Sequence, residues 1–126
     1  QQDLSDFQVL IIDAVGLLTK IYSYADIAYV GGGFATGLHN TLEPAVFGIP
    51  VIIGPQYKGF KEAEDLVAAG GIKVVTAKED LLQILNTLLA DFKFRTEVGR
   101  INSNYIEHNI GATYKIVEYI NSHSLL

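Results

Sequence analysis

The sequence of 126 residues contains no cysteine, no methionine and no tryptophan. Without cysteine the chain has no disulfide bond, no thiolate metal ligand and no cysteine nucleophile, which fits a cytoplasmic protein. Translated chains begin with methionine, whereas this sequence begins with Gln1. We therefore expect the sequence to be a piece of a longer protein.

Positive charge is also scarce. Nine Lys and Arg residues stand against fourteen Asp and Glu residues, which gives a net charge of -5. This balance argues against a nucleic-acid groove or a polybasic membrane patch, so no nucleic-acid partner is expected. An anionic ligand would have to be held by backbone N–H groups and a few cations. The longest apolar runs, Val9–Ile12 and Ile49–Ile53, are too short to span a bilayer.

Hydrophobic residues make up 49% of the chain, enough for a folded core, and the length suits a single domain over residues 1–126. Short β-rich runs recur along the first part of the chain, at Val9–Ile12, Ile27–Val30, Val51–Ile53 and Ile72–Val75. Continuous apolar strands that alternate with helices are typical of parallel sheets. The pattern predicts an α/β fold, with a parallel sheet of about four strands and helices on both faces.

Helical patterns fill the intervals between these runs and the rest of the chain. The expected helices cover residues 17–25, 40–47, 60–69, 78–90, 92–107 and 111–121. Thr76, with Glu79 three residues later, is typical of a capping box for the helix over 78–90. Gly99 is expected to weaken the helix over 92–107.

Ligands of open parallel sheets bind beyond the carboxyl ends of the strands, and the loops expected there are 13–16, 31–39, 54–59 and 76–77. The loop Gly31–Gly37 is rich in glycine, which lets a ligand approach main-chain N–H groups closely. It is neither a P-loop nor a dinucleotide fingerprint, because no Gly-Lys-Ser/Thr follows and Thr36 takes the third glycine position. The same loop is equally typical of a tight turn that binds nothing.

The next loop leads into a helix at His39–Ala45, with Pro44 in the first turn. The free N–H groups there suit a phosphate or carboxylate. Glu43 is a candidate ribose ligand, because one carboxylate can accept hydrogen bonds from two neighbouring hydroxyls. Asn40 and Glu43 also have the spacing of a capping box, so the carboxylate has the alternative role of capping its own helix.

The third loop, Gly54–Gly59, carries Tyr57 and Lys58, and Lys61 follows it. Either lysine is able to meet an anionic group of a ligand, and Tyr57 is able to stack on a base. An ordinary surface loop with solvated lysines is the alternative.

Two runs of residues resemble a known family. Glu43-x-Ala45-x-x-Gly48-x-Pro50-Val51 resembles the donor-side signature of GT-B glycosyltransferases. A longer pattern is similar to the C-terminal domain of the 3-deoxy-D-manno-octulosonic acid (Kdo) transferases, and it comprises Gly31-Gly32-Gly33-Phe34, Gly37-Leu38-His39-Asn40-Thr41-Leu42-Glu43-Pro44-Ala45, Gly48-Ile49-Pro50-Val51-Ile52, Gly54-Pro55 and Phe60-x-Glu62-Ala63. The resemblance covers about residues 9–120. The sequence departs from the family pattern at Leu17, Leu38 and Gly59, where Glu, Gly and Asn are common.

The resemblance implies that the chain is part of the Rossmann-like donor domain of a two-domain GT-B enzyme. Kdo transferases attach Kdo from CMP-Kdo to lipid A precursors in lipopolysaccharide biosynthesis, on the cytoplasmic side of the bacterial inner membrane. The implied partners are therefore a CMP-Kdo donor and a lipid A precursor, with no metal and no cofactor. These enzymes invert the anomeric centre with a carboxylate base on the N-terminal domain. We therefore expect no catalytic residue in this chain, and no activity of the chain alone.

The resemblance also assigns roles to single residues. Glu43 is expected to bind the ribose, and glycines and polar residues near it are expected to contact the phosphate or the sugar. The residues expected to bind the donor are Gly32, Gly33, His39, Asn40, Thr41, Glu43 and Lys58.

Alternatives from other classes remain open. One is a GT-B transferase or a nucleotide-sugar epimerase with a UDP-linked donor, and another is a non-catalytic α/β module whose glycine loops are only turns. Self-association of the chain is also expected. The strand over Val9–Ile12 would have an unpaired edge, and the last helix has Ala112, Ile116, Val117 and Ile120 on one face.

Overall fold

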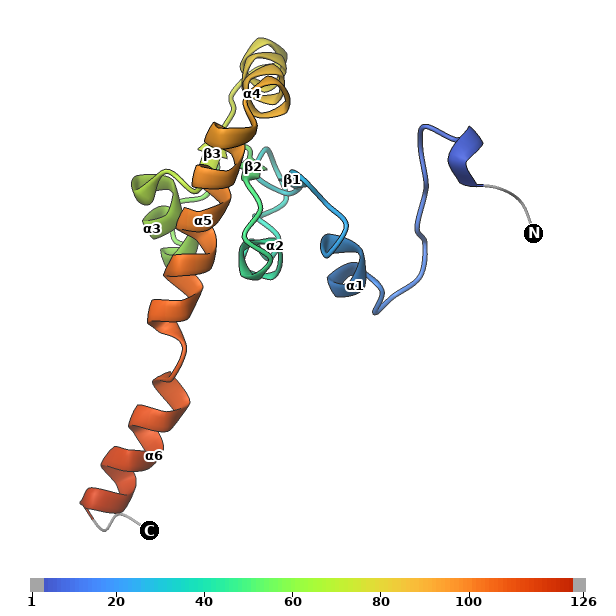
Figure 1. Cartoon of the computed structure of the whole chain (residues 1–126). Coiled ribbons are helices and arrows are strands. Elements are labelled where there is room, and N and C mark those ends of the chain that lie inside the picture. The colour runs from blue at the N-terminus through green and yellow to red at the C-terminus, as the bar shows by residue number, and fades with distance from the viewer. Residues whose placement is uncertain (1–3, 124–126) are drawn as a thin grey trace.

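The computed structural model describes residues 4–123 of the chain, without the side chains of Leu4, Ala112 and Thr113. A small parallel sheet lies among helices, and the last helix extends away from this body (Figure 1). The elements in chain order are η1 (Leu4–Asp6), α1 (Leu18–Tyr22), β1 (Ala28–Val30), α2 (Leu42–Val46), β2 (Val51–Ile53), α3 (Lys61–Ala69), β3 (Ile72–Val74), α4 (Lys78–Ala90), α5 (Phe92–Asn109) and α6 (Ala112–Ser122).

The sheet has the strand order β1-β2-β3, and both pairs of neighbours are parallel. In register, Ala28 pairs with Val51, and Val51 pairs with Ile72. The central strand β2 is buried on both faces, since Val51, Ile52 and Ile53 are all 0% exposed. A continuous run of β-branched residues is what a central parallel strand requires. The α/β class predicted from the sequence is confirmed, with a sheet of three strands.

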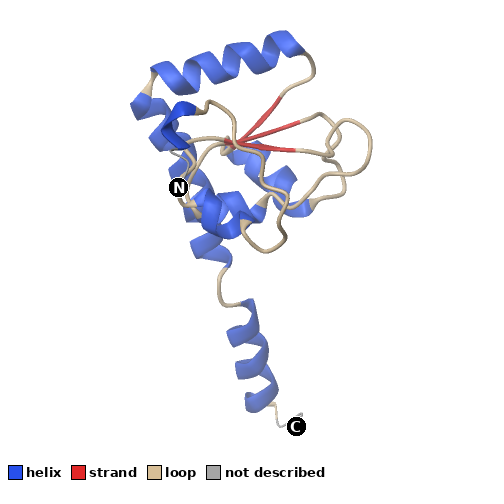
Figure 2. Cartoon of the chain, turned by 90° about the vertical axis from the view of Figure 1, so that its right-hand side faces the viewer, coloured by secondary structure: helices blue, strands red, loops and turns tan. Residues whose placement is uncertain are grey.

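Helices cover both faces of the sheet, as Figure 2 shows. Val51 and Ile53 point to one face, where they pack with Ala45 of α2 and with Ala63 and Leu66 of α3. Ile52 points to the other face and packs with a cluster that comprises Val75, Leu88 of α4 and Val98 of α5. The period of two along β2 therefore divides the core into two layers.

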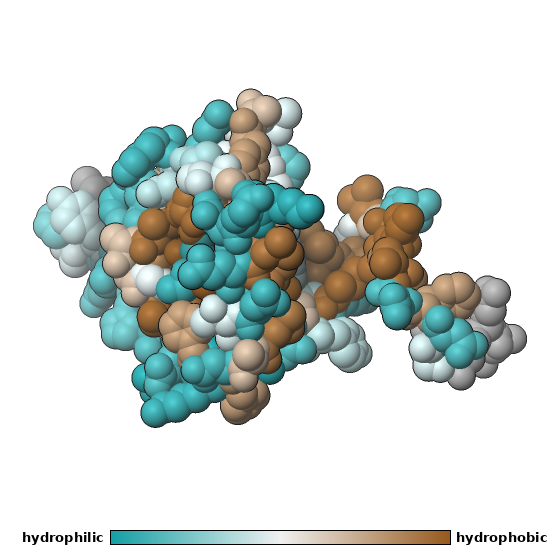
Figure 3. Space-filling view, turned by 90° about the horizontal axis from the view of Figure 1, so that it is seen from above, coloured by the Kyte–Doolittle hydropathy of each residue, from teal (hydrophilic) through white to brown (hydrophobic). Residues whose placement is uncertain are grey.

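The predicted strand over Val9–Ile12 is wrong. The segment before α1 runs away from the sheet as an extended arm (Figure 1), and Val9 and Ile11 are 77% and 85% exposed. Brown apolar atoms of this arm stand apart from the body in the space-filling view (Figure 3). A strand needs a neighbour that supplies backbone hydrogen bonds. Within residues 4–123 all strand pairing is among β1, β2 and β3, so this apolar run has no ladder to join.

The helix α5 packs against the turns that lead into β2 and β3, and Gly99 allows the close approach. A Cβ atom on Gly99 would collide with the carbonyl oxygen of Gly48. One turn further, the fully buried Asn102 donates from Nδ2 to the carbonyl oxygens of Ile49 at 2.8 Å and Gly71 at 2.9 Å. Gly99 was expected to be a weak point of the helix, whereas it is the position where α5 meets the turn before β2.

The start of α4 also differs in detail from the prediction. The carboxylate that closes the first turn is Asp80, which accepts hydrogen bonds from the Thr76 hydroxyl at 2.6 Å and the Thr76 backbone N–H at 2.9 Å. The expected partner was Glu79. The helix begins at Lys78, so the residue at the third helical position is Asp80.

The last helix, α6, extends beyond α5 and away from the sheet in both views (Figures 1 and 2). Ile116 and Val117 are exposed and Ile120 is half-buried, while the side chain of Ala112 lies outside the described part. Within residues 4–123, no helix combines the length and the apolar character of a membrane span.

Candidate functional site

Two loops meet beyond the carboxyl ends of the strands. The loop over 31–41 follows β1, and the loop over 54–60 follows β2. The backbone N–H of Gln56 donates to the carbonyl oxygen of Gly33 at 2.8 Å, and a Cβ on Gly33 would lie 2.8 Å from the nitrogen of Gly54. The expected position of the 31–39 and 54–59 loops, beyond the carboxyl ends of the strands, is confirmed. The loop over 13–16 lies on the N-terminal arm instead, because no strand precedes it.

The glycine-rich loop folds back on itself. Gly32 has a φ of 88°, a conformation that side chains other than glycine rarely adopt. A Cβ at this position would collide with the carbonyl oxygen of Gly37 and lie 2.8 Å from Cδ2 of His39. The backbone N–H of His39 donates to the carbonyl oxygen of Gly31 at 3.1 Å. The loop therefore places the His39 ring directly beside Gly32.

A short chain of hydrogen bonds orders the start of α2. The side-chain oxygen of Asn40 accepts from the backbone N–H of Leu42 at 2.9 Å, and its Nδ2 donates to Oε1 of Glu43 at 3.2 Å. The N-cap position belongs to Thr41, which is buried. Glu43 thus accepts a hydrogen bond from a side-chain amide. In a capping box, it would accept one from a backbone N–H. The contacts favour a carboxylate oriented by Asn40 over one that caps its own helix.

Glu43 is half-buried, and α1 packs beside it. Burial first, and the charge of Glu43 second, raise the pKa of Tyr22 in α1. The Tyr22 ring also packs against Phe47 with the ring centroids 6.2 Å apart. Tyr22 is therefore near enough to the Glu43 carboxylate to interact with its charge.

A cavity of about 220 Å³ lies between the start of α2 and the start of α3. Its lining consists of Leu38, His39, Asn40, Thr41, Leu42, Phe60, Glu62 and Ala63. We call it the loop pocket. A neighbouring groove of about 350 Å³ is lined by Leu42, Glu62, Tyr105, Ile106, Asn109 and Ile110. The two share Leu42 and Glu62, so they lie on either side of these residues.

The residues predicted to bind a ligand take three kinds of position. His39, Asn40 and Thr41 line the loop pocket. Gly32 lies against His39 of this lining, Gly33 meets Gly54 of the following loop, and Glu43 adjoins the lining through Asn40. Lys58 is exposed outside the lining, with its ammonium group 5.2 Å from the centre of the Tyr57 ring.

Cations contribute little to the loop pocket, since its lining includes neither Lys nor Arg. Lys61 is held by Asp65 at 2.6 Å, and so its charge is already paired. Among residues 4–123 no three acidic or histidine side chains come together as a metal site would need. An anion in the pocket would therefore be held mainly by backbone N–H groups at the glycine loop and the start of α2.

Sequence reasoning gave no ligand role to five residues of the loop pocket, Leu38, Leu42, Phe60, Glu62 and Ala63. Glu62 was named as part of the family pattern, but no ligand role was expected for it. The signal that could have found it is the one used for Glu43, a carboxylate in the first turn of a helix that follows a strand.

Comparison with known proteins adds three sequence relatives and one structure. The chain is 32% identical over 117 residues to the 3-deoxy-D-manno-octulosonic acid transferase of Chlamydia muridarum, 38% over 119 residues to that of Chlamydia trachomatis serovar D, and 33% over 116 residues to that of Haemophilus influenzae. These alignments cover 91%, 89% and 90% of the chain, but the chain spans only 27% of each relative. No family model matches the sequence.

The structural relative is the crystal structure of the C-terminal CMP-Kdo binding domain of WaaA from Acinetobacter baumannii. The TM-score is 0.68 at 23% identity, over 75% of this chain and 51% of that one. The likeness shows a shared fold.

Proposed function

Since the chain belongs to the family of Kdo transferases, of whose length it spans about a quarter, we propose that it forms the donor-binding part of such an enzyme. The donor is CMP-Kdo and the acceptor of the whole protein is a lipid A precursor. The whole protein is then a two-domain GT-B glycosyltransferase that inverts the anomeric centre. It acts at the cytoplasmic side of the bacterial inner membrane, and residues 1–126 belong to its nucleotide-sugar-binding domain.

The observation that carries the proposal is the meeting of the 31–41 and 54–60 loops beside the loop pocket. The pocket measures about 220 Å³, below the roughly 300–1,000 Å³ of pockets that enclose a whole ligand. It therefore holds one part of a nucleotide sugar, while the rest lies along the open surface. The adjoining groove offers further room on the far side of Glu62.

Within this site we assign the roles by chemistry. Glu43 accepts hydrogen bonds from the ribose hydroxyls, and Asn40 holds its carboxylate in place at 3.2 Å. Gly32 and Gly33 keep the backbone open to the phosphate, and His39, Asn40 and Thr41 contact the phosphate or the sugar. Lys58 approaches the anionic groups from the rim.

The catalytic base belongs to the part of the enzyme outside this chain, in this proposal. Transfer requires acceptor, base and donor in one geometry, and orientation carries much of the barrier reduction. We therefore expect the chain alone to bind donor nucleotide without turning it over. Its exposed apolar arm and α6 also favour self-association of the isolated chain.

The test is calorimetric titration of the chain with CMP and, separately, with UMP. The proposal predicts that CMP binds and that UMP binds more weakly. Preference for UMP would support a UDP-sugar enzyme instead, and no binding of either nucleotide would support a module that uses its glycine loops only as turns.

A further inference from the structure

The first turn of α3 forms one wall of the loop pocket. Phe60, Glu62 and Ala63 all line the pocket from this turn. Two carboxylates of the same helix close the turn. Oε1 of Glu64 accepts from the backbone N–H of Gly59 at 2.8 Å, and Oδ1 of Asp65 accepts from Nζ of Lys61 at 2.6 Å. The turn is thereby ordered from within, but these contacts alone do not join it to the rest of the domain.

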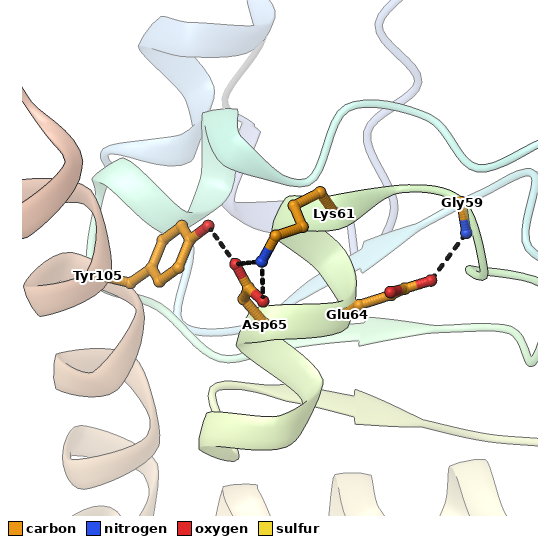
Figure 4. A network of polar contacts seen from close by, with 5 residues as sticks. All are labelled: Gly59, Lys61, Glu64, Asp65 and Tyr105. Carbon is orange, nitrogen blue, oxygen red and sulfur yellow. Dashed lines mark hydrogen bonds and ion pairs between the residues drawn. The ribbon is translucent and has the colours of Figure 1, made fainter. Parts of the chain in front are cut away.

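Besides the packing of Ala63 in the core, α5 provides a polar connection between this turn and the rest of the domain. The hydroxyl of Tyr105 donates to Oδ2 of Asp65 at 3.1 Å, across 40 residues of sequence. Figure 4 shows the Tyr105 hydroxyl and the Lys61 ammonium group converging on the Asp65 carboxylate, with the Glu64–Gly59 contact at the start of the same helix. Tyr105 also lines the adjoining groove, together with Glu62. One hydroxyl therefore connects the long helix α5 to the pocket wall.

The protonation states of Asp65 and Tyr105 favour the hydrogen bond between them. The hydrogen bond from Lys61, more than any other cause, lowers the pKa of Asp65, so the acceptor stays ionised. Burial, followed by the hydrogen bond to Asp65, raises the pKa of Tyr105, so the donor keeps its proton. A hydrogen bond to a charged acceptor is stronger than one between neutral groups.

We propose that Tyr105 is a positioning residue of the donor site. Through Asp65, its hydroxyl holds the first turn of α3, so that Phe60 and Glu62 keep their places in the wall of the loop pocket. The expected effect of Tyr105 on CMP binding rests on the proposed function. The expected effect of Tyr105 on the order of the first turn of α3 does not depend on any ligand.

The test compares Tyr105→Phe with a matched control, Tyr114→Phe on α6, where the tyrosine is 72% exposed. Both variants keep the ring and lose one hydroxyl. Amide hydrogen exchange of the chain without ligand is measured first, followed by titration with CMP. Tyr105→Phe is expected to speed exchange over residues 59–66 by roughly fivefold, the range of one hydrogen bond, while the sheet strands are unaffected. CMP affinity is expected to fall by a similar factor, and the control is expected to change neither.

Each other outcome is informative. Unchanged exchange over 59–66, or faster exchange throughout the core, would overturn the proposal, since the first shows no restraint and the second shows only general stability. Faster exchange confined to residues 59–66, combined with unchanged CMP affinity, would also overturn the proposal. If the unsubstituted chain binds no CMP but exchange still changes locally, the restraint by Tyr105 is supported and the proposed function fails instead.

Discussion

Replacement of Glu43 by Gln separates a ribose ligand from a structural carboxylate. In the structure Oε1 of Glu43 accepts from Nδ2 of Asn40 at 3.2 Å. The amide oxygen of Gln is able to accept the same hydrogen bond, so the start of α2 keeps its order. What the change removes is the charge. Hydrogen bonds to charged acceptors are worth about 1.5–3 kcal/mol against 0.5–1.5 kcal/mol for neutral ones, so a loss of about 1.4 kcal/mol is expected. That loss corresponds to roughly tenfold weaker CMP binding.

The assay is calorimetric titration of the unsubstituted chain and of Glu43→Gln with CMP and with dCMP, which lacks the ribose 2′-hydroxyl. If the carboxylate binds the ribose, the loss caused by the substitution is smaller with dCMP than with CMP, because part of the interaction is already missing. Glu97→Gln, at an exposed position of α5, serves as control and is expected to change neither affinity. Equal losses with both nucleotides would refute the ribose role. So would normal CMP binding combined with a lower melting temperature, the result that a cap of α2 would give.

Three further predictions concern stability and assembly. Asn102→Ala leaves two buried carbonyl oxygens, those of Ile49 and Gly71, without their donor. We expect the free energy of unfolding, measured in urea, to fall by about 3 kcal/mol, and a fall no greater than that of the exposed control Asn104→Ala would contradict this expectation. The hydrogen bonds from Thr76 lower the pKa of Asp80, so the contribution of this carboxylate to stability is present above the unfolded pKa of about 4 and is lost as the pH falls through the folded value. Asp80→Asn is expected to flatten the acid limb of the curve of stability against pH, and an unaltered limb would be evidence against this cap. Ile116→Glu on the exposed face of α6 is expected to reduce self-association in light scattering, and a chain that is monomeric at all concentrations before substitution would show the expectation to be wrong.

The parts of the fold that were predictable have local causes. Val51–Ile53 is a run of β-branched residues between Pro50 and Gly54, and it forms the central strand with the predicted bounds. The run Val9–Ile12 has the same character but forms no strand. The two runs differ in whether another strand lies beside them. Strand pairing depends on segments that are distant in the sequence, and local composition does not describe these segments. The N-cap position of α4 was likewise misplaced by one residue. This was enough to predict Glu79, and not Asp80, as the carboxylate that accepts the hydrogen bonds from Thr76.

The candidate site divides in the same way. The glycine loop, His39 and Asn40 were recognisable because they follow a strand directly and precede a helix. Tyr105 was not, because its role depends on how α3 and α5 pack against each other. The Tyr105–Asp65 contact and the bonds of Asn102 join segments that are 31 to 53 residues apart. Patterns with short periods carry no information on such distances.

A crystal structure of this chain with bound CMP-Kdo would locate the donor directly. We expect the ribose hydroxyls within hydrogen-bond distance of the Glu43 carboxylate, with the phosphate beside the backbone of Gly32 and Gly33. A nucleotide bound elsewhere on the chain, with no contact to the 31–41 and 54–60 loops, would show that these loops are not the donor site.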